Sequence, residues 1–249
     1  MTIANFRKEL IFNKIVLLFF ALILFVFAMC GASLAKTNQI GRNYDEQEIY
    51  DWKVYVEKDL KEHPNTLAKM LGKLKQELGA VRSKVPEKQL RVMQEANFWL
   101  VLRHKHVEGF DADFEIGGLF ITSKDWLQRH GEDKRKYFGI QLDQAYATPG
   151  FSNTAFHELS HYLHARQTDT LDHKLKKLFD ISREQAKTAR DSCRITDDGR
   201  YAFYDIYEFF AVFSSAFVFK SCHHPRNANV IRVTHPEMYD FLVQIWQKS

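Results

Sequence analysis

The sequence predicts an α+β fold, a mostly helical single domain with a small mixed sheet. The chain of 249 residues is long enough for one well-buried domain and short for two. Apolar residues recur at helical spacing in the early and late parts of the domain, and three short apolar runs between them are typical of strands. Helices, then a few strands, then helices is the order that an α+β domain shows.

Residues 1–35 are typical of an export signal. Basic residues lie near the start, and residues 15–35 contain no charge. The small residues Ser33 and Ala35 stand where a signal peptidase requires them, so cleavage after Ala35 is the first interpretation. The uncharged run of 21 residues could also be an uncleaved membrane anchor, and Cys30 could carry a lipid. All three interpretations predict a protein that is secreted, periplasmic or membrane-anchored and faces outside the cytoplasm.

Residues 36–51 are polar and are predicted to be a linker to the domain, which spans residues 52–249. The formal net charge is +4 and falls to +2 without residues 1–35, which contain three basic residues and one acidic residue. A nearly neutral body gives no electrostatic footprint for nucleic acid, which excludes a nucleic-acid-binding protein. Contact with a membrane is expected only through the N-terminal segment, if it is retained.

The first part of the domain is predicted to be helical. From Trp52 to about Leu78, apolar residues recur every three or four positions, which predicts amphipathic helix. Pro64 marks a break between two helices. Residues 84–95 predict a further helical turn or two.

Strands are predicted next. The three apolar runs are Asn97–Arg103, Ile116–Thr122 and Tyr137–Asp143. A helix is expected at residues 123–133, where Ser123 can cap its start. Pro149 and Gly150 then break the structure, and the remainder is predicted to be helical almost to Ser249.

The pattern HELSH lies in a helix-like segment. His157 and His161 are four residues apart, so their imidazoles lie one turn above each other on a helix and can bind one metal ion. Glu158 points about 100° around the helix, where it can reach a metal-bound water without being a ligand. This division of roles is the logic of HExxH zinc hydrolases. The pattern also arises by chance, so histidines that only pack are the alternative.

The third ligand must come from elsewhere in the chain. His164 is expected to cap or line the helix surface, and the position of a third histidine in one related pattern is occupied by Gln167. Glu208 is the candidate, because it stands in an apolar segment that predicts a buried helix, and a buried carboxylate needs a partner. The alternatives are a salt bridge from Glu208 to a lysine or arginine, or Asp205 as the ligand.

The spacing of these residues resembles the lethal-factor-like family of zinc metallopeptidases, which includes the catalytic domain of anthrax lethal factor and the Pro-Pro endopeptidases. Glu208, in EFFAVF, follows HELSH by 47 residues, and Tyr201 lies seven residues before it. The resemblance runs roughly from Thr148 to the C-terminal helix and implies a gluzincin-like metallopeptidase fold. It implies that His157, His161 and Glu208 bind Zn²⁺, that Glu158 is the general base, and that Tyr201 stabilises the oxyanion of a peptide substrate.

Two features depart from the family. A second acid often stands four residues after the glutamate ligand, and here that position is Val212. A carboxylate that would orient a ligand histidine is therefore missing or supplied by Asp205. The family also includes domains of the same fold that lost the metal motif and only bind partners. A non-catalytic zinc-containing module that binds a partner is thus the alternative to an enzyme, and a secreted toxin would differ only in its target.

The sequence offers more than one candidate for the oxyanion donor, and it predicts one strand for binding the substrate. Tyr204 and Tyr207 compete with Tyr201, which could instead be a core tyrosine. A peptide substrate is expected to bind as an extended chain along an edge strand, because main-chain hydrogen bonds then hold it without demanding a sequence. The strand predicted at Tyr137–Asp143 precedes the helix that carries HELSH and is the expected edge strand.

Cysteine usage agrees with an oxidising compartment. If Cys30 is removed with the leader, Cys193 and Cys222 remain as an even pair. Outside the cytoplasm this pair can form a disulfide that brackets Tyr201 and Glu208. Two buried free thiols are the alternative.

Overall fold

The computed structural model describes residues 44–102, 118–121, 139–148, 153–185 and 201–247. The predicted export signal at residues 1–35 and the helix predicted at residues 123–133 lie outside these ranges. Residues 45–249 group into one compact unit. Among the described residues, no helix combines the length and the hydropathy that crossing a membrane requires.

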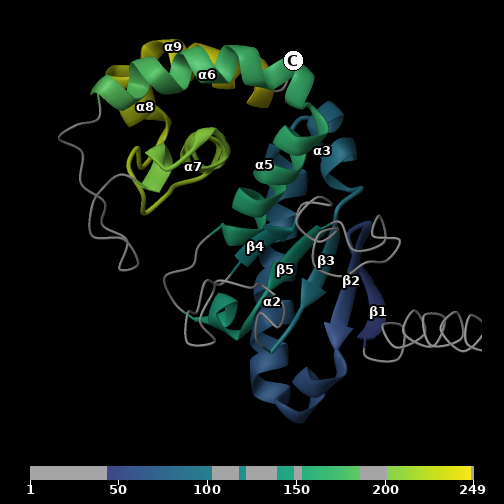
Figure 1. Cartoon of the computed structure of the whole chain (residues 1–249). Helices are drawn as coiled ribbons and strands as arrows, with labels where there is room; N and C mark the ends of the chain where they lie inside the picture. Colours follow the sequence, from purple (N-terminus) through teal and green to yellow (C-terminus); the bar gives the residue numbers. More distant parts are fainter. Residues whose placement is uncertain (1–43, 103–117, 122–138, 149–152, 186–200, 248–249) are drawn as a thin grey trace, which may run out of the picture. The chain divides into compact units, whose positions relative to one another are not determined.

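The described residues form an α+β fold that is mostly helical with a small mixed sheet, as predicted (Figure 1). The strands are β1 (Tyr44–Ile49), β2 (Trp52–Glu57), β3 (Asn97–Leu100), β4 (Gly118–Ile121) and β5 (Gly139–Leu142). The α-helices are α2 (Pro64–Lys84), α3 (Glu87–Met93), α5 (Thr154–Arg166), α6 (Thr168–Gln185), α7 (Ile206–Val218), α8 (Ala228–Thr234) and α9 (Pro236–Trp246). Short 3₁₀ turns are η1 (Lys58–Glu62), η3 (Gln144–Ala147) and η4 (Tyr201–Phe203).

The sheet has the strand order β1-β2-β3-β5-β4. Strands β2, β3 and β5 run parallel, whereas β4 is antiparallel to β5. A parallel neighbour needs a crossover, and α2 with α3 forms the crossover from β2 to β3. The two-residue turn between β1 and β2 places Tyr50 at φ 51° and Asp51 at φ 72°, the left-handed geometry of a tight hairpin.

Strand β5 was expected to be an edge, and this expectation is wrong. It pairs with β3 on one side and with β4 on the other, with Gly118 opposite Leu142. Its residues are all buried, as two-sided pairing requires. The edge of the sheet nearest α5 is therefore β4.

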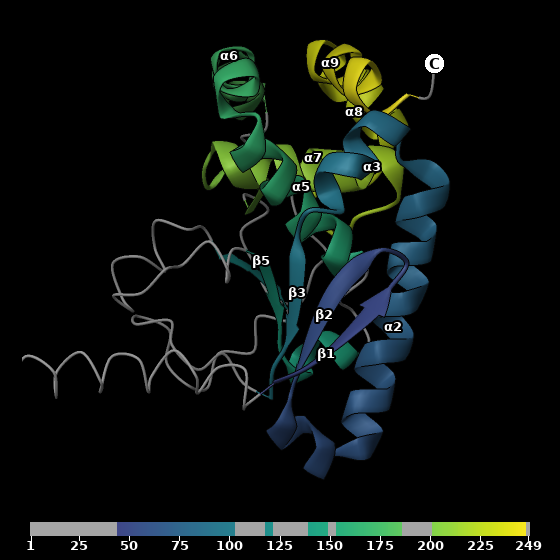
Figure 2. The ribbon, with the colours of Figure 1, turned by 90° about the vertical axis from the view of Figure 1, so that its right-hand side faces the viewer.

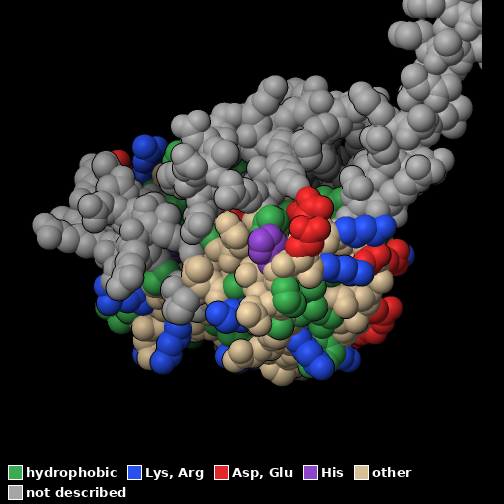
Figure 3. Space-filling view, turned by 90° about the horizontal axis from the view of Figure 1, so that it is seen from below, with side chains coloured by type: hydrophobic (Ala, Val, Ile, Leu, Met, Phe, Trp, Pro, Cys, Tyr) green, Lys and Arg blue, Asp and Glu red, His purple; other side chains and the backbone are tan. Residues whose placement is uncertain are grey.

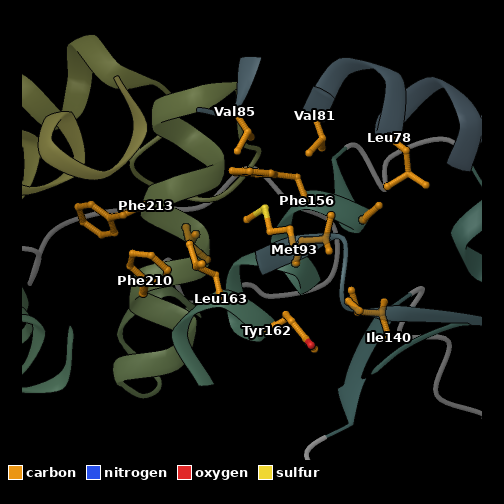
Figure 4. Close-up of a cluster of buried hydrophobic side chains, with 14 of the residues drawn as sticks. Leu78, Val81, Val85, Met93, Ile140, Phe156, Tyr162, Leu163, Phe210 and Phe213 are labelled. Atoms are coloured by element: carbon orange, nitrogen blue, oxygen red, sulfur yellow. The ribbon is translucent and has the colours of Figure 1, made fainter. Parts of the chain in front are cut away.

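The core lies between the sheet and the helices. Helix α2 runs along one face of the sheet (Figure 2), and its buried residues include Met70, Leu74, Leu78 and Val81. Helix α5 packs against α2, and its Phe156 lies among Val81, Val85 and Met93 (Figure 4). The backbone of the α3 segment is tied to the sheet, because the indole N–H of Trp52 donates to the Met93 carbonyl at 2.8 Å.

The helix predicted from Trp52 to Pro64 is wrong. This segment forms strand β2 and turn η1, and α2 begins at Pro64. Trp52, Val54 and Val56 alternate with less buried residues, which is the period of a strand that buries one face. The helical period starts only within α2, so Pro64 is a helix start and not a break between two helices.

The polar linker predicted at residues 36–51 is wrong in its second half. Residues Tyr44–Ile49 form the edge strand β1. The three central residues of β1 are exposed, including Glu46 and Glu48. Charged side chains are tolerated on an edge strand, because one side faces water, so the segment has the composition of a linker.

On the face seen in Figure 3, lysine and arginine side chains of the described residues are interspersed with acidic ones. No patch of a single charge stands out on the part of this face that is described. Interspersed charge is the usual state of a solvated surface. The small net charge of the sequence thus reflects mixed charges at this surface.

The pairing of β3 with β5 depends on Gly139. A Cβ atom at this position would lie 2.3 Å from the Asn97 carbonyl oxygen, which belongs to the neighbouring strand. We expect Gly139→Ala to lower the free energy of unfolding by about 1–3 kcal/mol. Gly72→Ala is the control, because a Cβ there meets nothing within 4 Å and alanine favours the helix by up to about 1 kcal/mol. Denaturant unfolding measures both, and an equal effect would contradict the role of Gly139.

Candidate metal centre

Helix α5 carries the HELSH motif, and its apolar face fixes its orientation. Phe156, Leu159 and Leu163 are fully buried, and they share one face at helical spacing. They pack against α2, α3 and α7. The opposite side of the helix presents His157 and His161, as the sequence predicted.

Glu208 reaches α5 from the first turn of α7. The Asp205 side chain caps this helix, because its Oδ1 accepts the backbone N–H groups of Tyr207 and Glu208, both at 2.8 Å. The buried residues that follow, such as Phe209 and Phe213, hold α7 against its neighbours. The alternative that Asp205 is the third ligand is therefore not supported, since its carboxylate is used as a helix cap.

Three donor side chains converge between α5 and α7. The two imidazole Nε2 atoms of His157 and His161 lie 3.1 Å apart. Oε2 of Glu208 lies 3.1 Å from His157 Nε2, and Oε1 lies 3.5 Å from His161 Nε2. Within the described residues, these three are the group whose donors could hold a metal ion. Among the residues that the structure describes, Glu208 pairs with these histidines and not with a lysine or arginine.

The distances suit a single tetrahedral ion. Two ligand atoms that each lie about 2.1 Å from one such ion are roughly 3.4 Å apart. The two imidazole nitrogens are 3.1 Å apart, and each has a Glu208 oxygen nearby, Oε2 at 3.1 Å from His157 and Oε1 at 3.5 Å from His161, which is close to that value. The site is also largely shielded from water, since His161 is 7% exposed. The residues present therefore fit a metal ion with nitrogen and oxygen ligands.

The charges of the group are mutually supporting. Burial alone would raise the pKa of the Glu208 carboxyl, but the neighbouring imidazoles of His161 and His157 outweigh this and hold the pKa well below its usual range. Glu208 is therefore a carboxylate at neutral pH. An ionised carboxylate is the form that a divalent cation requires of this ligand.

Glu158 lies beside the donors but is not one of them. It is 6% exposed and faces the first residue of the edge strand β4. A Cβ atom on Gly118 would stand 2.9 Å from Glu158 Oε1 and 2.5 Å from the Thr154 methyl carbon. The backbone of β4 thus approaches the carboxylate as closely as glycine allows.

Tyr201 points its hydroxyl toward the same carboxylates. It stands in η4, before α7, and donates a hydrogen bond to Glu208. Burial, followed by the charges of Glu208 and Glu158, raises the pKa of the Tyr201 phenol well above its usual value. Its competitors lie elsewhere, since Tyr204 is 82% exposed and Tyr207 packs on His164.

His164 was expected at the helix surface, and this is wrong. Its side chain is fully buried, and its Nε2 lies 2.6 Å from Asp172 Oδ1 on α6. Its ring also contacts the rings of Tyr207 and Phe210. His164 thus links α5 to α6 and α7, and it is not part of the donor group. An acid eight residues downstream is the only hint of this pairing in the sequence.

Sequence reasoning missed Glu77, which caps the metal helix from α2. The N-cap residue of α5, Asn153, has φ 60° and gives no side-chain cap. Glu77 instead accepts the backbone N–H groups of Asn153 at 3.0 Å and Ala155 at 2.9 Å, one with each carboxylate oxygen. A glutamate on the buried face of α2, between Leu74 and Leu78, is the signal that could have revealed it.

Cys222 forms a disulfide, so the free-thiol alternative is wrong for this residue. Cys193 lies outside the described residues, and its pairing with Cys222 stays a prediction. The bridge lies shortly after α7 and therefore anchors the segment that follows the Glu208 helix.

Comparisons of the chain with protein-family models, with curated proteins and with solved structures find no match. The function must therefore be argued from the chemistry of the site itself.

The Glu77 cap gives a test of how the metal helix is held. We expect Glu77→Ala to lower the free energy of unfolding by about 2–4 kcal/mol, because one buried and one partly buried N–H group lose their acceptors. Glu87→Ala is the matched control, since Glu87 forms an exposed pair with Arg91 on α3 and such pairs contribute less than about 1 kcal/mol. Denaturant unfolding measures both variants. A similar loss of unfolding free energy in Glu77→Ala and Glu87→Ala would contradict the capping role of Glu77.

Proposed function

We propose that the protein is a zinc-dependent endopeptidase that acts outside the cytoplasm. The convergence of His157, His161 and Glu208 on one point carries the proposal. The resemblance to lethal-factor-like peptidases supports it independently, because it concerns residue order and spacing rather than distances. The proposal includes a gluzincin-like arrangement of the domain.

Two imidazoles and one carboxylate are a donor set that suits zinc. Three protein ligands leave the fourth position for water, which distinguishes a catalytic site from a structural one. Zinc, when bound, lowers the pKa of that water toward about 7 and polarises the substrate carbonyl. No cysteine or further histidine joins the group within the described residues, as a closed structural site would need.

Glu158 is proposed as the general base. It takes the proton of the attacking water and passes it to the nitrogen of the leaving amine. Its carboxylate projects from α5 toward Gly118 of β4 and is not one of the three donor side chains. Burial among protein atoms limits competing solvent water.

Tyr201 is proposed to stabilise the oxyanion. Its phenol is protonated at neutral pH, as tyrosine ordinarily is, so it can donate its O–H to the developing negative charge. The charges of Glu208 and Glu158 both raise the pKa of this phenol, which puts the hydroxyl near ligand and base together. Its ring is only partly buried where it packs against the core, which supports a role at the site.

The edge strand β4 is proposed to bind the substrate. An extended peptide can add to a sheet only where a strand has an unpaired side, and β4 is the edge nearest α5. Its Gly118 lies against Glu158, so a peptide paired with β4 would pass close to the base. Main-chain pairing sets the direction of the peptide without selecting its side chains.

Purified protein is expected to carry about one zinc ion per chain. His161→Ala should lose it, because one of three protein ligands is gone. His173→Ala is the control, since His173 is exposed on α6. Elemental analysis of the three proteins decides, and equal zinc in wild type and His161→Ala would place the metal elsewhere.

Glu158→Gln is expected to retain zinc and to lower peptide cleavage by about a hundredfold or more, because the base is lost while the shape is kept. Cleavage is measured over a peptide library, with Glu237→Gln on the surface of α9 as the control. Unchanged cleavage would assign the activity to another site. Zinc-loaded wild type that cleaves no peptide would favour the non-catalytic partner-binding module.

A further inference from the structure

We propose that His223 is a positioning residue, which holds the ring of Tyr201 and thereby aims its hydroxyl. This inference deepens the proposed function and rests on it. The ring of His223 lies 4.5 Å from the ring of Tyr201, centroid to centroid, at an interplanar angle of 30°. The metal-donor ring of His157 lies 6.2 Å from Tyr201 at 25°. The ring of Tyr201 is thus stacked on one imidazole and in tilted contact with a second, nearer one.

Tyr201 needs such support because its own backbone element is short. Turn η4 has three residues, and Tyr201 is the first of them. Its carbonyl accepts the Tyr204 N–H at 3.1 Å, which fixes the turn but not the side-chain torsions. The direction of the hydroxyl therefore depends on contacts made by the ring.

His223 is well placed to provide a fixed surface. Its backbone N–H donates to Ser221 Oγ at 3.1 Å, and the Ser221 N–H donates to the Arg226 carbonyl at 2.9 Å. The residue before it, Cys222, is disulfide-bonded. These bonds hold the backbone of residues 221–226 and thereby fix the position of the His223 Cα atom.

The same loop is tied to the metal helix. The Asn153 side-chain amide donates to the Lys220 carbonyl at 2.9 Å, immediately before the loop. Asn153 is the N-cap residue of α5, one turn before His157. Movement of the loop relative to the donors is thereby restricted. The Tyr201 ring is therefore held by residues that are fixed to α5.

For catalysis, the direction of the Tyr201 O–H group is what matters. A donor stabilises an oxyanion only when its O–H is directed at the place where charge develops, and a small misplacement lowers the rate. A residue that only orients the Tyr201 hydroxyl should change kcat and leave KM and metal content unchanged. It should also have no effect once the tyrosine hydroxyl is absent.

Two substitutions separate the ring from its hydrogen bonds. His223→Gln removes the ring and keeps polar groups, whereas His223→Phe keeps a ring and removes the polar groups. We expect His223→Gln to lower kcat by about tenfold at unchanged KM and zinc content, and His223→Phe to recover most of that loss. His173→Gln controls for loss of an exposed histidine.

The double variant with Tyr201→Phe tests whether His223 acts through the hydroxyl. In that background His223→Gln should cause no further loss of kcat. A further loss of the same size would overturn the proposal, because His223 would then act independently of Tyr201. A kcat loss that follows a lower fraction of folded protein in thermal melting would overturn it as well.

A second measurement needs neither metal nor substrate. Tetranitromethane nitrates exposed tyrosine rings, and mass spectrometry gives the rate at each position. Tyr204, 82% exposed, is the internal reference. Nitration of Tyr201 should be slow in wild type and His223→Phe, and should rise toward that of Tyr204 in His223→Gln.

The outcomes distinguish this inference from the proposed function. Failure of zinc-loaded wild type to cleave any peptide would remove the peptidase proposal, while nitration would still decide whether His223 covers Tyr201. Cleavage that depends on Tyr201 but not on His223, with unchanged nitration, would overturn the positioning role and leave the peptidase proposal intact.

Discussion

The contact of α5 with α7 is the constraint on which the rest of the domain depends. It places a buried carboxylate between two imidazoles, and a carboxylate without such partners would be costly in this apolar setting. The buried aromatic side chains of α7 fix how far Glu208 lies below the surface. The Asp205 cap fixes the residue at which α7 begins. Fold and site are thus set by the same packing.

Local sequence patterns were enough for some elements and not for others. The runs at β3, β4 and β5 are short and apolar, so their positions could be predicted, and HELSH identified the donor helix. Strand β2 was mistaken for helix because its alternation lasts only six residues and leads into a long helical pattern. Strand β1 was taken for a linker because an edge strand tolerates charged residues. The sheet order, and with it the edge at β4, depends on pairing that no local pattern contains.

The same division holds for the site. The spacing of His157, His161, Glu208 and Tyr201 follows from chain order, and could be proposed from the sequence. The surroundings could not be predicted. Glu77 contacts α5 although 76 residues of chain separate Glu77 from Asn153. His223 contacts Tyr201 although the whole of α7 lies between them in the sequence. Residues that hold a site in place are selected by three-dimensional proximity. They have no spacing rule of their own.

The Glu77 cap has a consequence for the order in which the chain is made. Helix α2 leaves the ribosome before α5, so the acceptor for the first N–H groups of the donor helix exists before that helix is synthesised. Glu208 comes later still, which leaves the histidine pair without its carboxylate until α7 emerges. Because α5 also packs against α7, the Glu77 cap supplies only part of what holds α5. The donor set itself is complete only once Glu208 of α7 has been synthesised.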